Sequence, residues 1–379
     1  MMVESGPPAA RAGAILHVDL DAIAANFHRV AGEAPGAACG AAIKANAYGL
    51  GVDRVAPVLA RAGADPFFVA TLDEALALRH VLTEAGYPHP RIQVLNGLPP
   101  GDHDILLAHG LTPVLNSLAE VERWRQLAHA RGEALPAALH LDTGMSRLGL
   151  PDDETTRLVR EPERLNGIAL TAVMSHLACA DHPDHAENTA QLARFRKAAQ
   201  RMPAAAERSL ANSSGIFLGA AYHFDLVRPG AALYGINPTP GRPSPVHPVV
   251  RLQGRVLQVR QIDRYRGVGY GSTYRADRTT RLATVAVGYA DGYPLAASNR
   301  AHAVVAGHRV PVAGRISMDS LILDVSGIPA DEPLPGQLVD LIDPTHDVDA
   351  LADEAGTIGY ELLTQLGERV HRSYHGGDG

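Results

Sequence analysis

Short apolar runs alternate with longer segments of helical periodicity along the first two thirds of the chain. Eight runs are predicted as strands: 39–43, 66–69, 92–95, 112–115, 137–141, 170–175, 208–211 and 225–227. Between them, segments such as 72–85, 118–130 and 186–200 carry apolar residues at helical spacing. This alternation favours an α/β barrel of the eight-stranded TIM type, for which about 250 residues is typical.

The structural rival is a doubly wound open sheet. Such a sheet has fewer strands and carries a nucleotide-binding fingerprint after one of them, and no such fingerprint is visible here. A strand at 15–20 and a helix at 22–30, which Asp21 can cap, come before the eight runs. We assign this first strand to the barrel domain, although it could instead pack on the second domain.

The pattern changes near Pro238. Residues 238–248 are rich in proline, which suits neither a helix nor a central strand, and we interpret them as a linker. The runs 249–259, 283–287, 303–305, 321–325 and 338–341 then read as strands, with helices at 350–355 and from Tyr360 onward. We therefore expect a disordered or loosely held segment at 1–14, the barrel at 15–240 and a mostly β C-terminal domain at 241–379.

Composition narrows the class of protein. The 379 residues exceed the usual size of one core, and 46% hydrophobic with 20% charged residues is ordinary for a globular protein. The net charge of -7 argues against a nucleic-acid surface, and the absence of a long apolar run argues against a membrane span. Cys39 and Cys179 are too few for a disulfide framework or a cysteine metal site, so we expect no metal. With no signal pattern at the start, a cytoplasmic protein is expected.

Lys44 is the candidate around which the chemistry can be organised. It follows the apolar strand 39–43 and precedes the turn residues Asn46, Gly49 and Gly51. A partly desolvated lysine loses affinity for its proton and becomes a nucleophile toward carbonyls, as a Schiff base with an aldehyde cofactor requires. The alternative is a lysine whose stem covers the core while its head stays in water.

Polar residues also follow the later strands. Because the carboxyl ends of barrel strands share one face, we expect these residues to lie near Lys44: Asp142, Arg147, His176, Asn212, Ser213, Ser214 and Arg228. The small residues after the last two strands suit a phosphate, although Ser213 and Ser214 could simply cap helices. A phosphate together with a Schiff-base lysine describes pyridoxal 5′-phosphate.

Six motifs in order carry a resemblance to the alanine racemases, pyridoxal-phosphate enzymes of fold type III. They begin at Ala42, Asp142, Arg228, Val268, Val287 and Gly314, and they read AIKANAYG, DTGMSRLG, RPGAALYG, VGYGSTY, VGYADGY and GRISMD. The resemblance covers residues 15 to about 375. It implies the interconversion of L-alanine and D-alanine by two-base proton transfer on a Schiff base of the cofactor.

The resemblance also implies two catalytic bases on opposite faces of the substrate. Lys44 would hold the cofactor and serve as one base, and Tyr270, contributed by the other subunit of a head-to-tail homodimer, would be the second. His176 matches the position that assists ionisation of this tyrosine. Arg228 matches the partner of the pyridine nitrogen; because arginine keeps its proton, the ring is a weaker electron sink and prompt reprotonation is favoured.

The remaining implied contacts fall into two groups. Residues that match cofactor contacts are Lys44, Tyr48, His176, Ser213, Arg228, Gly230, Ala231 and Tyr360, and those that match substrate contacts are Arg147 and Met318, the latter from the partner. Tyr360 also matches a position that crowds the substrate side chain. Two positions depart from the family pattern. His140 stands where many relatives have a lysine, often carbamylated, that braces the arginine, and Leu295 stands where an arginine is common.

Several alternatives stay open from the sequence. They are a racemase of broader specificity, for instance toward serine, a fold-type III decarboxylase, and a non-catalytic carrier of the cofactor. Such decarboxylases generally pair the ring nitrogen with a carboxylate and use a cysteine in the β domain, whereas this chain has Arg228 and no cysteine after Cys179. A second domain with Tyr270 and Met318 argues against the carrier. D-alanine biosynthesis and a catabolic role both remain possible.

Overall fold

The computed structural model describes residues 6–98 and 101–377. These residues form two compact units, which are described separately. The barrel unit contains 23–47 and 51–247, apart from 99–100, and the β unit contains 6–22, 48–50 and 248–377.

The barrel unit is built on parallel strands that follow one another in chain order. Its main sheet runs β3 (Ala41–Ala42), β4 (Phe67–Val69), β5 (Ile92–Val94), β6 (Thr112–Leu115), β7 (Leu135–His140), β8 (Ile168–Met174) and β9 (Glu207–Ser209). The last strand, β10 (Leu226–Val227), pairs in parallel with β2 (Ala38–Cys39), which leads into β3 through Gly40. The first barrel strand is therefore one segment with a neighbour on each side.

Hydrogen bonds close the barrel. The amides of Ala38 and Ala42 donate to the carbonyls of Asp225 and Pro229, each at 2.8 Å. On the other side of the last strand, Arg228 donates its amide to Ala211 at 2.9 Å. The eight-stranded barrel that the sequence predicts is confirmed.

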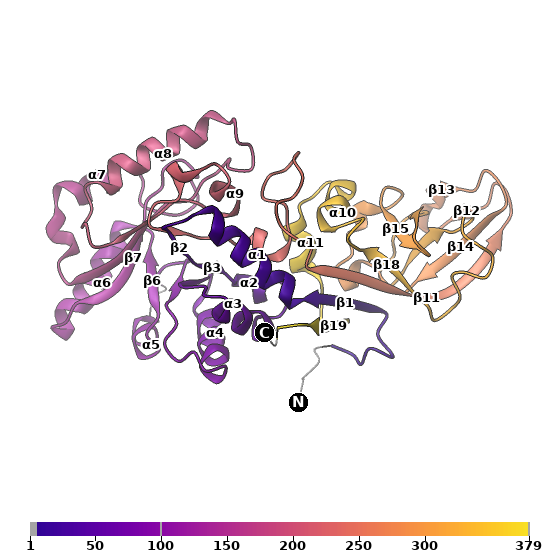
Figure 1. The fold of residues 1–379 in the computed structure, drawn as a ribbon, viewed down its shortest axis with the longest axis horizontal. Coiled ribbons are helices and arrows are strands. Elements are labelled where there is room, and N and C mark those ends of the chain that lie inside the picture. The colour runs from indigo at the N-terminus through magenta and orange to yellow at the C-terminus, as the bar shows by residue number, and fades with distance from the viewer. Residues whose placement is uncertain (1–5, 99–100, 378–379) are drawn as a thin grey trace. The chain divides into compact units, whose positions relative to one another are not determined.

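Helices connect the strands and lie outside them (Figure 1). They are α3 (Val52–Arg61), α4 (Leu72–Glu84), α5 (His103–Ala108), α6 (Leu118–Arg131), α7 (Asp152–Arg160), α8 (Ala186–Ala199) and the short α9 (Ser213–Ile216), while α1 (Leu20–Glu33) precedes β2. The predicted helices at 72–85, 118–130 and 186–200 end within one residue of these bounds. Successive strands fill the interior with apolar side chains, among them Phe68, Val114, Ala138, Met174 and Leu226.

The β unit is centred on the long strand β11 (Val250–Ile262). Its main sheet runs β16 (His308–Pro311), β15 (His302–Val305), β18 (Leu338–Ile342), β11, β1 (Ala14–Asp19) and β19 (Val370–His375), and β14 (Thr280–Val285) joins β11 to β17 (Leu321–Asp324). Beside it lie the hairpin of β12 (Gly267–Val268) with β13 (Tyr274–Arg275) and the helices α10 (Val348–Ala355) and α11 (Gly359–Gln365). The prediction of a mostly β second domain is confirmed.

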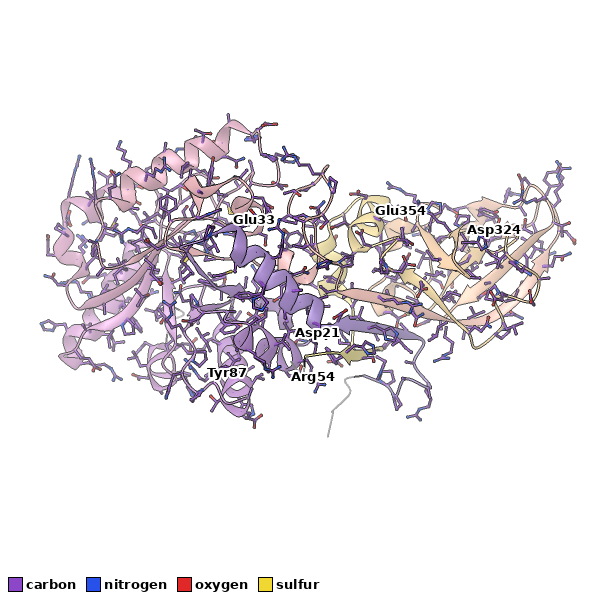
Figure 2. The ribbon with its side chains drawn as sticks, in the orientation of Figure 1. Asp21, Glu33, Arg54, Tyr87, Asp324 and Glu354 are labelled. Carbon is purple, nitrogen blue, oxygen red and sulfur yellow. The ribbon has the colours of Figure 1, made fainter. Side chains whose placement is uncertain are left out.

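Strand β1 joins the two ends of the chain in one sheet. It is antiparallel to β11 and parallel to β19, with Leu16 opposite Leu252 on one side and Arg372 on the other. A side-chain contact also joins the outer strands, because the hydroxyl of Tyr274 donates to Asp324 at 2.9 Å. Asp324, the last residue of β17, is labelled in Figure 2.

The predicted domain limits stay predictions. Residues 1–5 of the segment 1–14 lie outside the described residues, and within 6–14 the carbonyls of Ala9 and Ala12 accept hydrogen bonds from Arg255 at 3.0 and 3.1 Å. Among the residues that the structure describes, no helix combines the length and the apolar character needed to cross a bilayer.

Gly40 allows the first barrel strand to pass close to its neighbour. A Cβ at this position would lie 2.5 Å from the carbonyl oxygen of Pro66 and 2.7 Å from the ring of Phe68. We expect Gly40→Ala to lower the free energy of unfolding by about 1–3 kcal/mol, because close-packed backbone cannot move aside. Urea unfolding measures the change.

Gly32 provides the matched control. It lies in α1, where a Cβ would meet nothing within 4 Å, so Gly32→Ala should raise stability by about 0.5–1 kcal/mol through helix propensity. Equal effects of the two substitutions would contradict the role assigned to Gly40.

Candidate active site

Lys44 follows the first barrel strand, as the sequence predicts. Burial lowers the pKa of its amine, the charge of Arg147 lowers the pKa further, and the carboxylate of Glu74 opposes both effects. An amine in this environment is more readily deprotonated than a surface lysine, and therefore a better nucleophile.

The turn after Lys44 has an unusual backbone. Ala45, Asn46, Ala47 and Tyr48 have φ values of 53, 54, 54 and 55°, which is the left-handed helical region. Each such residue costs about 1–2 kcal/mol for an L-amino acid, so the turn needs support from its surroundings. Part of it is local, because the Asn46 side chain accepts from Val52 N–H at 2.7 Å and Ala47 N–H donates to Ile43 at 3.0 Å.

Three of the predicted strand-end residues, Lys44, Arg147 and Arg228, lie close enough to His176 to change its pKa. This histidine follows β8, and burial holds its pKa well below the usual value. Electrostatic interactions with Arg228, Arg147, His140 and Lys44 lower the pKa further. The imidazole is therefore neutral near pH 7. Strand ends that share one face of a barrel would place these residues near one another in this way.

Arg228 is buried beneath this face. Its guanidinium donates to Ser209 Oγ, to the carbonyl of Ser175 and, at 3.4 Å, to His176 Nδ1. Burial lowers the pKa of Arg228 to about 10, so the side chain still carries its proton at neutral pH. Its Nε–H has no acceptor among residues 6–98 and 101–377, which leaves one donor for a ligand atom.

Ser213 joins the loops that follow the last two barrel strands. Its Oγ accepts from the amides of Gly230 at 2.9 Å and Ala232 at 3.2 Å. A hydroxyl has two acceptor sites and one donor, so the O–H of Ser213 must point to a further acceptor. The amide of Ala231 likewise has no acceptor within the described part of the chain.

These groups fit pyridoxal 5′-phosphate. The amine of Lys44 can attack the aldehyde, the Nε–H of Arg228 can bind a neutral pyridine nitrogen, and Ser213 with the Ala231 amide can bind phosphate oxygens. Within 6–98 and 101–377, the Nε–H of Arg228 and the amide of Ala231 lack acceptors, and the cofactor would supply them.

His140 occupies the position where the family often has a carbamylated lysine. Its Nδ1 lies 2.8 Å from Asn116 Oδ1, and Asn116 donates its amide to Leu95 and Val114, so Nδ1 carries the proton. Burial, with the charges of Arg228 and Arg147, lowers the pKa of His140 to about 4. This position therefore places a neutral imidazole, not an anion, near Arg147.

Arg147 is exposed on a loop whose backbone is hydrogen-bonded to the side chain of Asp142. One carboxylate oxygen of Asp142 accepts the amides of Gly144, Met145 and Ser146 at 2.9 to 3.1 Å. Within the described ranges, Arg147 forms no hydrogen bond or ion pair, and its guanidinium is free for an anionic ligand.

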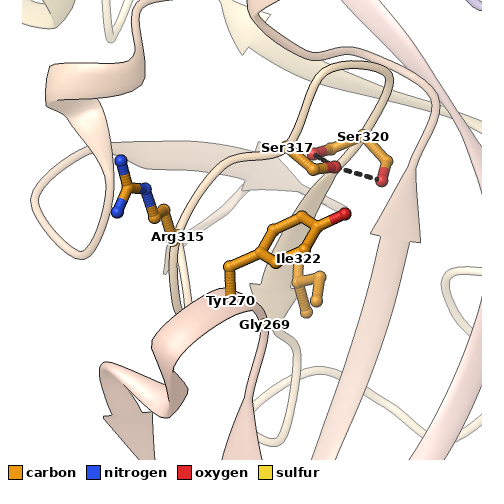
Figure 3. A pocket seen from close by; sticks show the side chains of 6 residues that line it. All are labelled: Gly269, Tyr270, Arg315, Ser317, Ser320 and Ile322. Carbon is orange, nitrogen blue, oxygen red and sulfur yellow. Dashed lines mark hydrogen bonds between the residues drawn. The ribbon is translucent and has the colours of Figure 1, made fainter.

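The β unit holds the other predicted residues. Tyr270 is 71% exposed and Met318 is 53% exposed. Tyr270 lines a hollow of about 360 Å³ with Gly269, Arg315, Ser317, Ser320 and Ile322 (Figure 3). Its hydroxyl points toward the side formed by Ser317 and Ser320, whose hydroxyls are 2.9 Å apart.

A tight backbone contact and an ion-pair network hold the loop of Met318. A Cβ at Gly288 would lie 2.3 Å from the carbonyl oxygen of Ser317, and the Ala290 amide donates to Met318 at 3.0 Å. Arg369 bridges Asp291 at 3.0 Å and Asp319 at 2.7 Å. Met318 therefore stands on a fixed loop although its side chain is exposed.

Tyr48 and Tyr360 pair within the β unit. Their ring centroids are 6.1 Å apart, and burial raises the pKa of the Tyr48 phenol, which stays protonated and can donate. The predicted site residues are thus divided, with Lys44, Arg147, His176, Ser213, Arg228, Gly230 and Ala231 in the barrel unit and Tyr48, Tyr270, Met318 and Tyr360 in the β unit.

Sequence reasoning missed several residues that position the site. Asn116 orients His140, Arg369 holds the Met318 loop, and Glu74 contacts the amide after Lys44 at 2.7 Å. Of these three, only Glu74 could have been found from the sequence, because Thr71 followed three residues later by a glutamate is a capping-box pattern. The partners of the others are far away in the chain.

His140 makes the stability of the chain sensitive to acid. The pKa of His140 is lower in the folded chain, about 4, than its ordinary 6.5, so the unfolded chain binds more protons between these values. The free energy of unfolding should fall as pH drops through this window, by about 1.4 kcal/mol per pH unit from this group.

Urea unfolding of wild type and of His140→Gln across this pH range checks the expectation. The free energy of unfolding of the variant should change less steeply with pH, because about one proton fewer is bound on unfolding. Parallel pH profiles would mean that His140 is not buried in its neutral form.

Comparisons with known proteins agree with this geometry. Residues 18–238 match the family model "Alanine racemase, N-terminal domain", and residues 249–374 match "Alanine racemase, C-terminal domain". The chain is 50% identical to a protein named "Alanine racemase, catabolic" of Mesorhizobium japonicum over 368 residues, which are 97% of this chain and 95% of that protein. It is also 50% identical to an alanine racemase of Rhodospirillum rubrum, with 97% of each chain covered.

A solved structure gives the same result. The alanine racemase of Bartonella henselae, determined with covalently bound pyridoxal phosphate, superposes with a TM-score of 0.91 at 40% identity and covers 96% of this chain and 100% of that one. The chain belongs to the alanine racemase family.

Proposed function

We propose that this chain interconverts L-alanine and D-alanine with pyridoxal 5′-phosphate as cofactor. The single observation that carries the proposal is the place of Lys44 beside the seam at which Ala42 donates to Pro229, next to the buried Arg228, whose guanidinium contacts His176. The names of the relatives point to the same reaction.

Each barrel residue has a task in this reaction. When bound, the cofactor withdraws electrons from the α-carbon of the attached amino acid and so acidifies the α-proton. Lys44 holds the cofactor and exchanges a proton on one face, while Ser213 and the backbone at Gly230 and Ala231 bind the phosphate. Arg228 keeps its positive charge at the pyridine nitrogen without transferring a proton.

We infer that the second base is Tyr270 of the partner subunit in a homodimer. A racemase must remove a proton from one face and return one to the other, so a second group opposite Lys44 is needed. The exposure of Tyr270 and Met318 in the single chain supports a surface that another copy covers. His176 accepts from Arg228 at Nδ1, its Nε2 lies 3.4 Å from the side-chain amide nitrogen of Asn212, and the ring can assist ionisation of this tyrosine.

The substrate contacts follow from charge and size. Arg147 is the cation for the substrate carboxylate, since a guanidinium binds a carboxylate with two hydrogen bonds. Met318 of the partner subunit and Tyr360 would limit the space beside the α-carbon to a small side chain such as a methyl group. No observation favours a decarboxylase or a carrier over the racemase.

The proposal also covers the cellular setting and the domain limits. We infer a cytoplasmic enzyme, because both cysteines are free thiols, as in reducing compartments. The reaction is reversible, and one relative is named catabolic, so both D-alanine biosynthesis and breakdown fit the chemistry. We also propose 15–240 and 241–379 as the two domains, with the first strand, 15–20, packed on the second domain, where β1 pairs with β11 and β19.

The two bases can be tested separately in deuterated solvent. Tyr270→Phe should lower racemisation by about 10²-fold to 10⁴-fold, because it removes one proton-transfer group. The enantiomer whose α-proton faces Lys44 should still exchange that proton with solvent, but its configuration should not be inverted. The measurements are deuterium incorporation by mass spectrometry and chirality by chromatography.

Tyr265→Phe is the matched control, since Tyr265 is 64% exposed and precedes the same hairpin. It should keep wild-type activity. Full activity of Tyr270→Phe, or equal losses in both variants, would refute the two-base assignment.

A further inference from the structure

We propose that Glu74 is a positioning residue that holds the lysine-bearing turn in its left-handed conformation. The inference rests on the proposed function, because it concerns the lysine assigned there to the cofactor. Glu74 lies in the first turn of α4 and touches neither substrate nor cofactor in this proposal.

The carboxylate of Glu74 joins two strand ends. Oε1 accepts the amide of Ala45, the residue directly after Lys44, at 2.7 Å. Oε2 accepts the amides of Ala70 at 2.7 Å and Thr71 at 3.3 Å, where β4 leads into α4. One side chain therefore fixes the chain after Lys44 to the neighbouring strand–helix unit of the barrel.

The helix N-terminus sets the orientation of this carboxylate. Thr71 caps α4, and its Oγ accepts the amide of Glu74 at 3.3 Å in a reciprocal capping box. Because this box restrains the backbone of Glu74, the side chain has little freedom left. It is a preorganised acceptor for the Ala45 amide.

The turn requires such an acceptor because its backbone is strained. Four consecutive residues from Ala45 to Tyr48 have positive φ, and Ala45 is the first of them. If the Ala45 amide lost its partner, the turn could relax toward ordinary φ values and carry Lys44 with it. Glu74 also raises the pKa of Lys44, against burial and Arg147, so it acts on the amine through charge as well.

The contacts require a carboxylate and not just a side chain of this size. Both oxygens accept backbone N–H groups. Glutamine has the same shape but a single acceptor oxygen, so its NH₂ group would face either the Ala45 or the Ala70 amide donor. Glu74→Gln therefore removes the interaction with little change in volume.

Glu120 offers a matched control in the same barrel. It stands in the first turn of α6, and its carboxylate accepts the amides of Asn116 at 2.5 Å and Leu98 at 3.3 Å, with Ser117 as the cap. Glu120→Gln repeats the chemical change at an equivalent helix start that does not contact the turn after Lys44.

The experiment titrates the full-length chain with pyridoxal 5′-phosphate after removal of bound cofactor. Imine absorbance gives the dissociation constant, borohydride reduction followed by peptide mapping gives the fraction trapped on Lys44, and urea unfolding without cofactor gives stability. Glu74→Gln should bind about tenfold or more weakly, since a charge-assisted hydrogen bond is lost. Glu120→Gln should bind within about twofold of wild type.

A rescue variant separates the turn from general stability. Ala45 is exposed, and glycine adopts positive φ without a Cβ penalty, so Ala45→Gly in the Glu74→Gln background should recover most of the cofactor affinity. If Glu74→Gln alone does not fold, this double variant decides: recovery supports the proposal, and failure to recover overturns it.

The outcomes also separate this inference from the proposed function. If wild type is not trapped on Lys44, the proposed function itself fails. If wild type is trapped but Glu74→Gln binds cofactor normally, or if both glutamine variants weaken binding equally, the role of Glu74 is overturned while the assignment of Lys44 stands.

Discussion

Closure of the barrel between its first and last strands is the constraint on which the candidate site depends. Ala42 N–H donates to Pro229 at 2.8 Å and Gly40 N–H donates to Val227 at 3.0 Å. Lys44 follows directly on one side of this seam and Gly230 on the other. The seam therefore brings together the lysine and the phosphate-binding backbone, which are far apart in the chain, and it buries Arg228 beneath them.

The closed barrel then brings positive charge together at one face, from the buried Arg228 to the exposed Arg147. Lys44, Arg147 and Arg228 all act on His176, whereas the nearby carboxylates of Glu74 and Asp142 accept backbone amides. Like charges repel one another, so an anionic ligand is the natural complement of this arrangement. A ligand with a phosphate and a substrate with a carboxylate both meet that need, and the neutral His176 avoids adding a further charge.

Sequence patterns predicted the barrel, its strand order and the residues at the strand ends, because periodicity and strand direction are local properties. The hand of the turn after Lys44 could not be predicted, since alanine and tyrosine rarely adopt positive φ and Glu74 supplies the support from another strand–helix unit. The neutral state of His140 was equally hidden, because it depends on burial and on Asn116. Contacts between distant segments decide both features.

The two proposed bases have opposite structural settings, and each setting suits its chemistry. Lys44 must keep a lowered pKa, so it stands in the buried barrel mouth on a strained turn. Tyr270 is exposed on a hairpin and, in the proposed dimer, meets the substrate only when the barrel of another copy faces it. The loop that carries Met318 is already fixed in the single chain. The tight packing of Gly288 and the ion pairs of Arg369 with Asp291 and Asp319 hold it. A surface ordered in advance loses little entropy when another chain covers it, so the proposed dimer can set the second base accurately.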